Sequence, residues 1–204
     1  MPNAKTFDTV YANGNGKRMI ETMILSVTAF VVTNIDDLLM DTLLFAAASS
    51  GAERRRVFAG KYLGMGVLLA ISVLGALGLQ LLPQKYIAFL GVIPIALGVR
   101  ELLKAEGSED ETAERSPDFM LNTALITVAN GADNIGVYVP LFAGFAVWQI
   151  LLSIFVFLGL IAVWCCLGKT LAGLPVLQNV LARYRKIMVP VVYIALGVYV
   201  LFLL

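Results

Sequence analysis

The sequence predicts an all-α membrane protein of six transmembrane helices, arranged as two inverted three-helix repeats. Its 204 residues are 59% hydrophobic and only 14% charged, whereas soluble domains are about 45–50% apolar and about 25% charged. A helix needs about 20 mostly apolar residues to cross a bilayer. Six stretches meet or approach this length, namely residues 22–48, 57–82, 86–103, 119–146, 148–168 and 187–204.

The second half of the chain repeats the first. A displacement of 97 positions places segment 33–38 (TNIDDL) on segment 130–135 (NGADNI), and a displacement of 99 aligns five identical residues at 95–99 and 194–198. Because each half has an odd number of spans, the second half would cross the membrane in the opposite sense. Many secondary transporters have such inverted repeats, with the substrate site near the midplane where the repeats meet. The predicted parts are a polar N-terminal tail (1–21), a first repeat (22–103), a charged linker (104–118) and a second repeat (119–204).

The basic residues predict the orientation of the chain. Eleven of the 15 lysines and arginines lie in the connections after the first, third and fifth spans, and four lie on the opposite side. Lys and Arg are enriched in cytoplasmic loops, so we expect both termini on the non-cytoplasmic side and the linker in the cytoplasm. The cytoplasmic set is Arg54, Arg55, Arg56, Lys61, Arg100, Lys104, Arg115, Lys169, Arg183, Arg185 and Lys186.

Several functional classes are excluded or disfavoured by composition and motifs. A net charge of +1 gives no basic field for nucleic acid, and the absence of histidine removes imidazole as a ligand or general base. The Gly168-Lys169-Thr170 run resembles the end of a phosphate-binding loop, but Val163 stands where that motif needs glycine. The sequence therefore predicts neither an enzyme nor a resident cofactor, and any pumping would draw on an ion gradient.

Four carboxylates lie inside the predicted spans: Asp36, Asp37, Asp41 and Asp133. Each would cost roughly 2.5–3.5 kcal/mol at the bilayer centre if it had no partner. We expect no lysine or arginine to neutralise them from within a span, since Lys61 is placed near a span end where its side chain can snorkel. Either protons or a bound cation must then offset the charge, and both suit a cation transporter.

The carboxylates belong to two polar motifs that the inverted repeat would bring together. On a helix, Asn34, Asp37 and Asp41 share one face, and the second motif is also expected to present one broad face. We expect Asp36 to face Asp133, Asp37 to face Asn134, and discontinuous helices to free backbone carbonyls. Such an oxygen-rich cage suits a divalent cation. The predicted metal ligands are Asn34, Asp36, Asp37, Asn130, Asp133 and Asn134, and the predicted pathway residues are Thr33, Asp41 and Tyr138.

Some of these residues have simpler interpretations. Thr33, Asn34 or Asn130 could each only hydrogen-bond a neighbouring helix, and Asp41 could handle protons or simply bond Tyr138.

The cysteines and small residues also leave alternatives open. Adjacent Cys165 and Cys166 match neither a zinc spacing nor a CxxC redox motif, and free cysteines are commonly buried apolar residues. They could instead offer thiolates to a soft metal or a redox relay. The stretch from Gly60 to Gly64 would permit close helix contacts, either within a protomer or in a homo-oligomer.

At the two motifs the chain resembles the cadmium-resistance transporter family (CadD type) of the lysine-exporter superfamily. The resemblance is carried by segment 33–38 and by segment 129–142, with sequence ANGADNIGVYVPLF, and it extends over residues 22–204. It implies six spans, export of Cd²⁺ and also Zn²⁺, residence in the bacterial inner membrane, and a pathway through the Asp and Asn residues of both segments. The residues themselves indicate only a cation site.

We therefore expect secondary-active, proton-coupled efflux of divalent metal through the lipid bilayer. The alternatives are export of an amino acid or another small cation, and a membrane thiol-redox protein that uses Cys165 and Cys166.

Overall fold

The structure is a computed structural model, and it describes residues 4–35, 37–81, 90, 92–103, 118–172, 190–191 and 193–202. Within these residues all regular secondary structure is helical, which agrees with the predicted class. The helices are α1 (Ala4–Thr33), α2 (Asp37–Ala47), α3 (Gly51–Leu79), α5 (Val92–Leu103), α6 (Phe119–Asn130), α7 (Ala132–Ala143) and α8 (Val147–Leu171). A further apolar helix covers Tyr193–Phe202.

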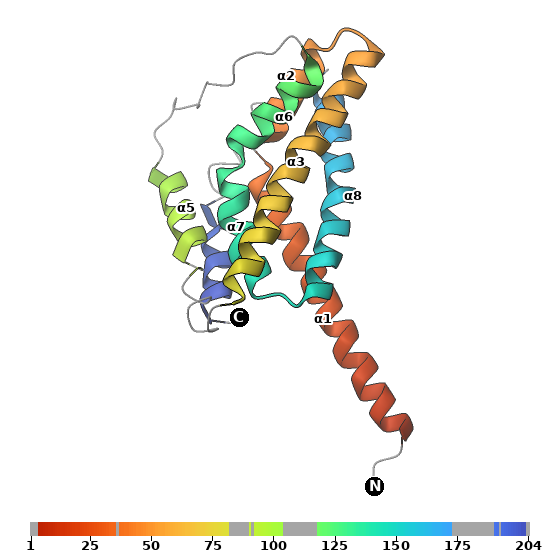
Figure 1. Cartoon of the computed structure of the whole chain (residues 1–204), viewed down its shortest axis with the longest axis vertical. Helices are drawn as coiled ribbons and strands as arrows, with labels where there is room; N and C mark the ends of the chain where they lie inside the picture. The colour runs from red at the N-terminus through yellow and green to blue at the C-terminus, as the bar shows by residue number, and fades with distance from the viewer. Residues whose placement is uncertain are drawn as a thin grey trace.

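The helices form one bundle of two groups that run in opposite directions. In Figure 1, α1, α2 and α8 run toward the upper end of the molecule, whereas α3, α6 and α7 run toward the lower end. Helix α3 packs along α6 and α7, while α8 packs along α1 and α2. The pair α1–α2 therefore runs antiparallel to the pair α6–α7.

The first predicted span is a broken helix. Helices α1 and α2 meet at an angle of 61° across a short break. On the α1 side of the break, the backbone N of Asn34 donates to the carbonyl of Phe30 at 3.0 Å. On the α2 side, the backbone N of Leu38 donates to the carbonyl of Asn34 at 3.1 Å. Helix α1 begins at Ala4, within the segment predicted as a polar tail.

Helix α3 is fixed at its start by a capping box and along its length by small residues. Ser50 accepts a hydrogen bond from Glu53 N at 3.2 Å, and Glu53 accepts one from Ser50 N at 3.0 Å. A Cβ at Gly60 would collide with the Met120 carbonyl, and one at Gly64 would lie 2.7 Å from Thr127 Cβ. The small-residue stretch therefore serves a contact within the chain, between α3 and α6.

The second motif is also interrupted by a helix break. Helix α6 is capped by Asp118, which accepts from Met120 N at 2.9 Å, and it ends before Gly131. A Cβ at Gly131 would overlap Leu68 of α3, and one at Gly136 would lie 2.7 Å from Leu97 of α5. Both glycines thus permit close approach of a neighbouring helix.

Aromatic side chains form the core beneath the two breaks. Phe157 of α8 lies 5.4 Å from Phe30 and 4.8 Å from Tyr138, measured between ring centroids. Trp164 stands edge-on to Phe30 at 5.4 Å. Aromatic pairs of this kind add about 0.5–1.5 kcal/mol beyond area burial. They make a rigid platform that α1, α7 and α8 share.

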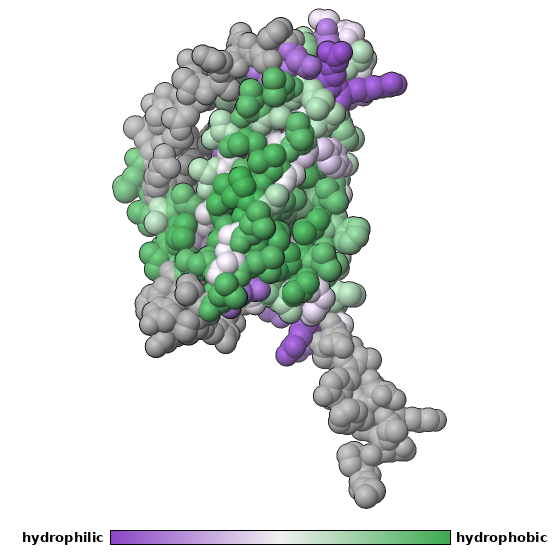
Figure 2. Space-filling view, viewed as in Figure 1, coloured by the Kyte–Doolittle hydropathy of each residue, from purple (hydrophilic) through white to green (hydrophobic). Residues whose placement is uncertain are grey.

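The outer surface is that of a membrane protein. Helices α3 and α8 are long and apolar enough to cross a bilayer, and a third span is added when the bent pair α1–α2 is taken as one. Large hydrophobic side chains are exposed along the bundle, among them Leu74 at 70% and Phe155 at 74%. Figure 2 shows a continuous hydrophobic face, with hydrophilic residues gathered where α3 begins. The linker 104–118, apart from Asp118, and all of 173–189 lie outside the described residues, so the predicted six spans stay a prediction.

Candidate functional site at two helix breaks

The break between α1 and α2 lies deep in the bundle and is held by α8. Asn34 is completely buried, and its backbone carbonyl accepts a 2.6 Å hydrogen bond from Trp164 Nε1 as well as the bond from Leu38 N. A buried backbone carbonyl needs such partners. The carbonyl of Asn34, one of those that a helix break was expected to free for a ligand, is therefore already satisfied.

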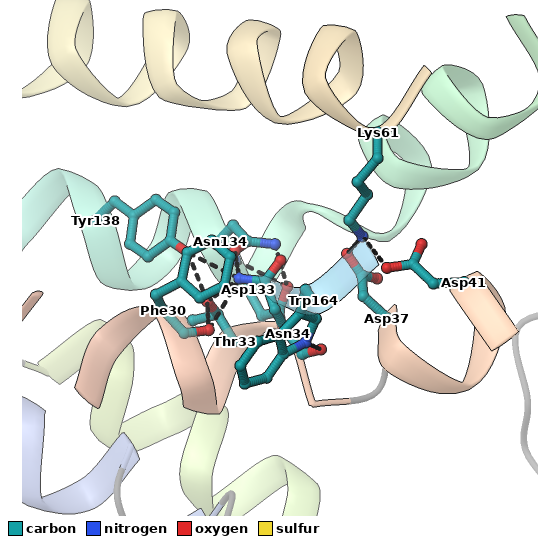
Figure 3. Close-up of polar contacts among 10 residues, drawn as sticks. All are labelled: Phe30, Thr33, Asn34, Asp37, Asp41, Lys61, Asp133, Asn134, Tyr138 and Trp164. Atoms are coloured by element: carbon teal, nitrogen blue, oxygen red, sulfur yellow. Dashed lines mark hydrogen bonds and ion pairs between the residues drawn. The ribbon is translucent and has the colours of Figure 1, made fainter. Parts of the chain in front are cut away.

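The side chains of the two breaks meet in one hydrogen-bonded cluster (Figure 3). The Asn34 amide donates to Asn134 Oδ1 at 3.1 Å and to the Tyr138 hydroxyl at 3.0 Å. The hydroxyls of Thr33 and Tyr138 share a hydrogen bond of 2.7 Å. All four side chains are buried. The structure thus brings Thr33, Asn34, Asn134 and Tyr138 together, although the two segments are about 100 residues apart in sequence.

Asp133 lies at the edge of this cluster, in the first turn of α7. Its Oδ1 accepts from the backbone N of Asn134 at 2.8 Å, and its Oδ2 accepts from the Tyr193 hydroxyl at 2.7 Å. The side chain is half-buried. A helix N-terminus favours negative charge, so Asp133 is stabilised by the helix, by a backbone donor and by a phenol.

The acids of the first motif turn the other way, toward a lysine. Lys61 Nζ lies 2.6 Å from Asp37 Oδ2 and 3.3 Å from Asp41 Oδ2. These three residues are 1–3% exposed, and Figure 3 shows the ammonium reaching from α3 to both carboxylates of α2. Gly168 of α8 lies behind Asp41, where an added Cβ would come within 3.1 Å of the Asp41 Cβ. The triad is therefore enclosed by α2, α3 and α8.

Two expectations about charge are wrong. Lys61 does not snorkel from a span end, because α3 begins at Gly51 and Lys61 follows ten residues later, about 15 Å along the axis. Its ammonium is buried against Asp37 and Asp41 instead. Lys61 therefore no longer counts as a cytoplasmic basic residue. Ten of the eleven remain, against four on the opposite side, so the predicted orientation does not change.

The expected facing pairs are also different from those observed. Asp37 does not face Asn134 but bonds Lys61, and Asn134 receives its hydrogen bond from Asn34. Asp41 is ion-paired with Lys61, while Tyr138 bonds Thr33 and Asn34. Asp36, and hence its expected pairing with Asp133, lies outside the described residues.

The metal-ligating groups do not form a ready-made carboxylate cage. No group of three or more His, Cys, Asp and Glu residues lies within reach of one ion in the described part of the chain. Asn130 is half-buried at the end of α6. The arrangement consists instead of a neutral amide and hydroxyl cluster with a charged triad beside it along the α1–α2 break.

The charges and unfilled acceptors of this region favour a cation. With its groups ionised, the triad of Asp37, Asp41 and Lys61 carries one net negative charge. Within the described residues, three buried side-chain oxygens accept no hydrogen bond: Asn34 Oδ1, Asp41 Oδ2 and Asn122 Oδ1. Two of the three belong to the candidate site, and the Asp41 atom has only its ion pair with Lys61. Buried acceptors without donors are costly, and a bound cation would satisfy them.

Comparison with known families identifies the chain. The family model for cadmium resistance transporters matches residues 30–203. The chain belongs to the cadmium resistance transporter family. This match covers both helix breaks, Lys61 and the helix that carries Tyr193. Comparisons with curated proteins and with solved structures give no match.

The sequence does not predict three residues that contact the site of this transporter: Lys61, Trp164 and Tyr193. Lys61 had a usable signal. It lies directly beside Gly60 and four residues after Val57, on the stripe of α3 that also includes Gly64, and such a stripe packs against other helices. Trp164 and Tyr193 are aromatic residues among many, and nothing in their spacing distinguishes them from core residues.

The two cysteines of the transporter follow Trp164 on α8, and Cys165 lies near enough to Asp41 and Lys61 for their charges to act on its thiol. Cys165 is buried and Cys166 is exposed on α8, and both are free thiols. Their one-residue separation places them on different faces of the helix.

Proposed function

We propose that this protein exports divalent heavy-metal cations, Cd²⁺ and also Zn²⁺, by secondary active transport through the site between the two helix breaks. Membership of the cadmium resistance transporter family supports metal transport. The observation that carries the location of the site is the direct contact of Asn34 with Asn134. This contact joins the centres of two antiparallel, interrupted helix pairs inside an apolar bundle, which is the setting that transporters with inverted repeats use for substrate binding.

The proposed ligands are oxygens from both breaks. Asn34 Oδ1 and the carboxylates of Asp37 and Asp133 would contribute, with Asp36, Asn130 and Asn134 completing the set. Asp37 is the first residue of α2 and Asp133 is the second of α7, so each carboxylate is held at a helix end. Cadmium prefers sulfur, and oxygen ligands bind it weakly. Weak binding suits a carrier that must release its substrate at the far side of the membrane.

The energy would come from protons. Cytosolic metal would displace protons from the carboxylates, the two halves would rock about the fixed site, and protons returning from outside would expel the metal. Alternating access by rocking of repeats is the usual mechanism for this architecture. We propose six spans in the bacterial inner membrane with both termini on the non-cytoplasmic side; the prediction of a homo-oligomer stays open.

Transport in proteoliposomes tests this function. The full chain is reconstituted with a metal-sensitive dye inside the vesicles, and an imposed pH gradient drives Cd²⁺ movement against protons. We expect gradient-dependent Cd²⁺ flux, its reversal when the gradient is reversed, and a weaker flux with Asp36→Asn. Flux equal to that of empty vesicles would contradict the proposal.

Export of an amino acid is the competing transport function, and Lys61 bears on it. A buried lysine could in principle bind a substrate carboxylate. However, Lys61 already contacts two carboxylates, so the triad attracts cations rather than anions. Lysine flux measured in the same vesicles separates the two functions, because an amino-acid exporter would carry lysine and ignore Cd²⁺.

A thiol-redox function is tested by the double variant Cys165→Ser with Cys166→Ser. A thiol relay would be abolished, whereas a carrier with oxygen ligands would keep its Cd²⁺ flux.

A further inference from the structure

The position of Lys61 raises a question that metal transport alone does not answer. An ammonium group lies within contact distance of two carboxylates in a site where a metal cation is expected to bind. Lys61 is 1% exposed, so water does not solvate its ammonium group. A buried lysine would add little to the stability of the fold, because the free energy of desolvating buried charges commonly cancels their attraction.

We propose that Lys61 is a tethered counter-cation: its ammonium occupies the cation position between Asp37 and Asp41 in the metal-free protein, and a divalent ion must displace it. This inference rests on the proposed function, and it adds Asp41 to the proposed metal ligands. It concerns the selectivity and release of the metal, which neither family membership nor the ligand set explains.

The geometry supports displacement rather than a permanent bridge. Nζ makes a short hydrogen bond to Asp37 at 2.6 Å, whereas its contact with Asp41 Oδ2 is longer, at 3.3 Å. A smaller, doubly charged ion could approach both carboxylates without this mismatch. Lys61 is carried by α3 and the acids by α2, so displacement of the ammonium would also free the two helices from each other.

The charge balance explains how this device would select divalent ions. The two carboxylates carry two negative charges, and Lys61 neutralises one of them. A monovalent ion that replaced the ammonium would gain no charge over it and would have to compete with a group tethered at high effective concentration. A divalent ion neutralises the pair. Lys61 would therefore exclude Na⁺ and K⁺ and would also limit the affinity for Cd²⁺, which speeds release.

Cd²⁺ binding to the purified full chain tests the proposal, with Lys61→Met compared to Lys61→Arg. Removal of the positive charge should tighten Cd²⁺ binding about tenfold or more, slow transport turnover, and make binding sensitive to added KCl. Lys61→Arg keeps the charge and should stay close to the wild type in affinity and KCl response. A folded Lys61→Met protein with unchanged or weaker Cd²⁺ affinity would overturn the proposal.

A second pair of variants decides the matter if Lys61→Met does not fold. Asp41→Asn retains the Lys61–Asp37 contact, and the double variant Lys61→Met with Asp41→Asn leaves one carboxylate without a cation. The double variant should bind Cd²⁺ more tightly than Asp41→Asn alone, and equal affinities would overturn the proposal. Failure of the proposed function gives a different result, because the wild type would then neither bind nor transport Cd²⁺.

Discussion

The two helix breaks carry similar polar residues, but the carboxylate at each break has different partners. At the first break, Asp37 is buried and bonded to the ammonium of Lys61, while at the second break Asp133 is half-buried and bonded to the Tyr193 phenol and a backbone amide. The first carboxylate thus contacts a full opposite charge, and the second accepts hydrogen bonds from a phenol and a backbone amide. Acids at two helix breaks of one bundle can therefore have unequal electrostatic surroundings.

The largest expected effect is that of Asp37→Asn. The change removes the buried carboxylate nearest to the ammonium and converts the triad from a net negative to a neutral group. We expect Cd²⁺ affinity and transport to fall by at least about 100-fold, as measured by direct titration and by vesicle flux. Asp118→Asn is the matched control, because Asp118 is an exposed carboxylate that caps α6 and asparagine caps helices equally well. Flux unchanged in Asp37→Asn would remove the first break from the site.

Asp133→Asn should have a smaller effect, about tenfold on Cd²⁺ transport. The amide keeps one acceptor oxygen for the Asn134 backbone N, and its NH2 group can donate to the Tyr193 hydroxyl, so the local fold survives while the charge is lost. Tyr193→Phe serves as the paired variant, since it removes only the hydroxyl and keeps the carboxylate. If Tyr193→Phe matched the loss in Asp133→Asn, the role of Asp133 would be structural rather than ligating.

The contact that positions Lys61 can be tested with Gly60→Ala. Its new Cβ would meet the Met120 carbonyl of α6, so α3 must shift, with an expected cost of about 1–3 kcal/mol. Gly66→Ala on the same helix is the control, because an added Cβ there finds nothing within 4 Å. Thermal unfolding in detergent measures both. Equal melting temperatures for the two variants would show that α3 and α6 do not approach as closely as described.

The smallest effect is expected for Thr33→Val. This change removes the hydroxyl that bonds Tyr138 but keeps the shape of the side chain, and Asn34 still donates to Tyr138. We expect a loss of about 1 kcal/mol in stability and nearly normal Cd²⁺ flux. Loss of flux as large as in Asp37→Asn would mean that Thr33 itself is a ligand.

The sequence predicts the class of the fold and the residues that meet, but not their pairing. Hydropathy predicts α3 and α8, because a long run of apolar residues is visible in the sequence. The repeated motif predicts that the segments of Asn34 and Asn134 converge. The pairing depends on which way each side chain points after a helix break. A break changes the helical phase, so face assignments for a continuous helix fail at Asp37 and Asp41.

The location of Lys61 was missed for a related reason. The arginines at 54–56 suggested that the span begins after them, whereas the helix itself begins at Gly51 under the Ser50 cap. Span boundaries drawn from hydropathy alone therefore placed a buried cation at a membrane interface. The glycine stripe beside Lys61 indicated which way it faces.

X-ray absorption spectroscopy of Cd²⁺ bound to the wild-type chain is the most direct test of a cation site formed by the two breaks. We predict a first shell of oxygen atoms around the metal, and less bound metal in both variants, with a larger decrease in Asp37→Asn than in Asp133→Asn. A first shell that contains sulfur, or a bound metal that both variants retain, would place the ion elsewhere and contradict the account.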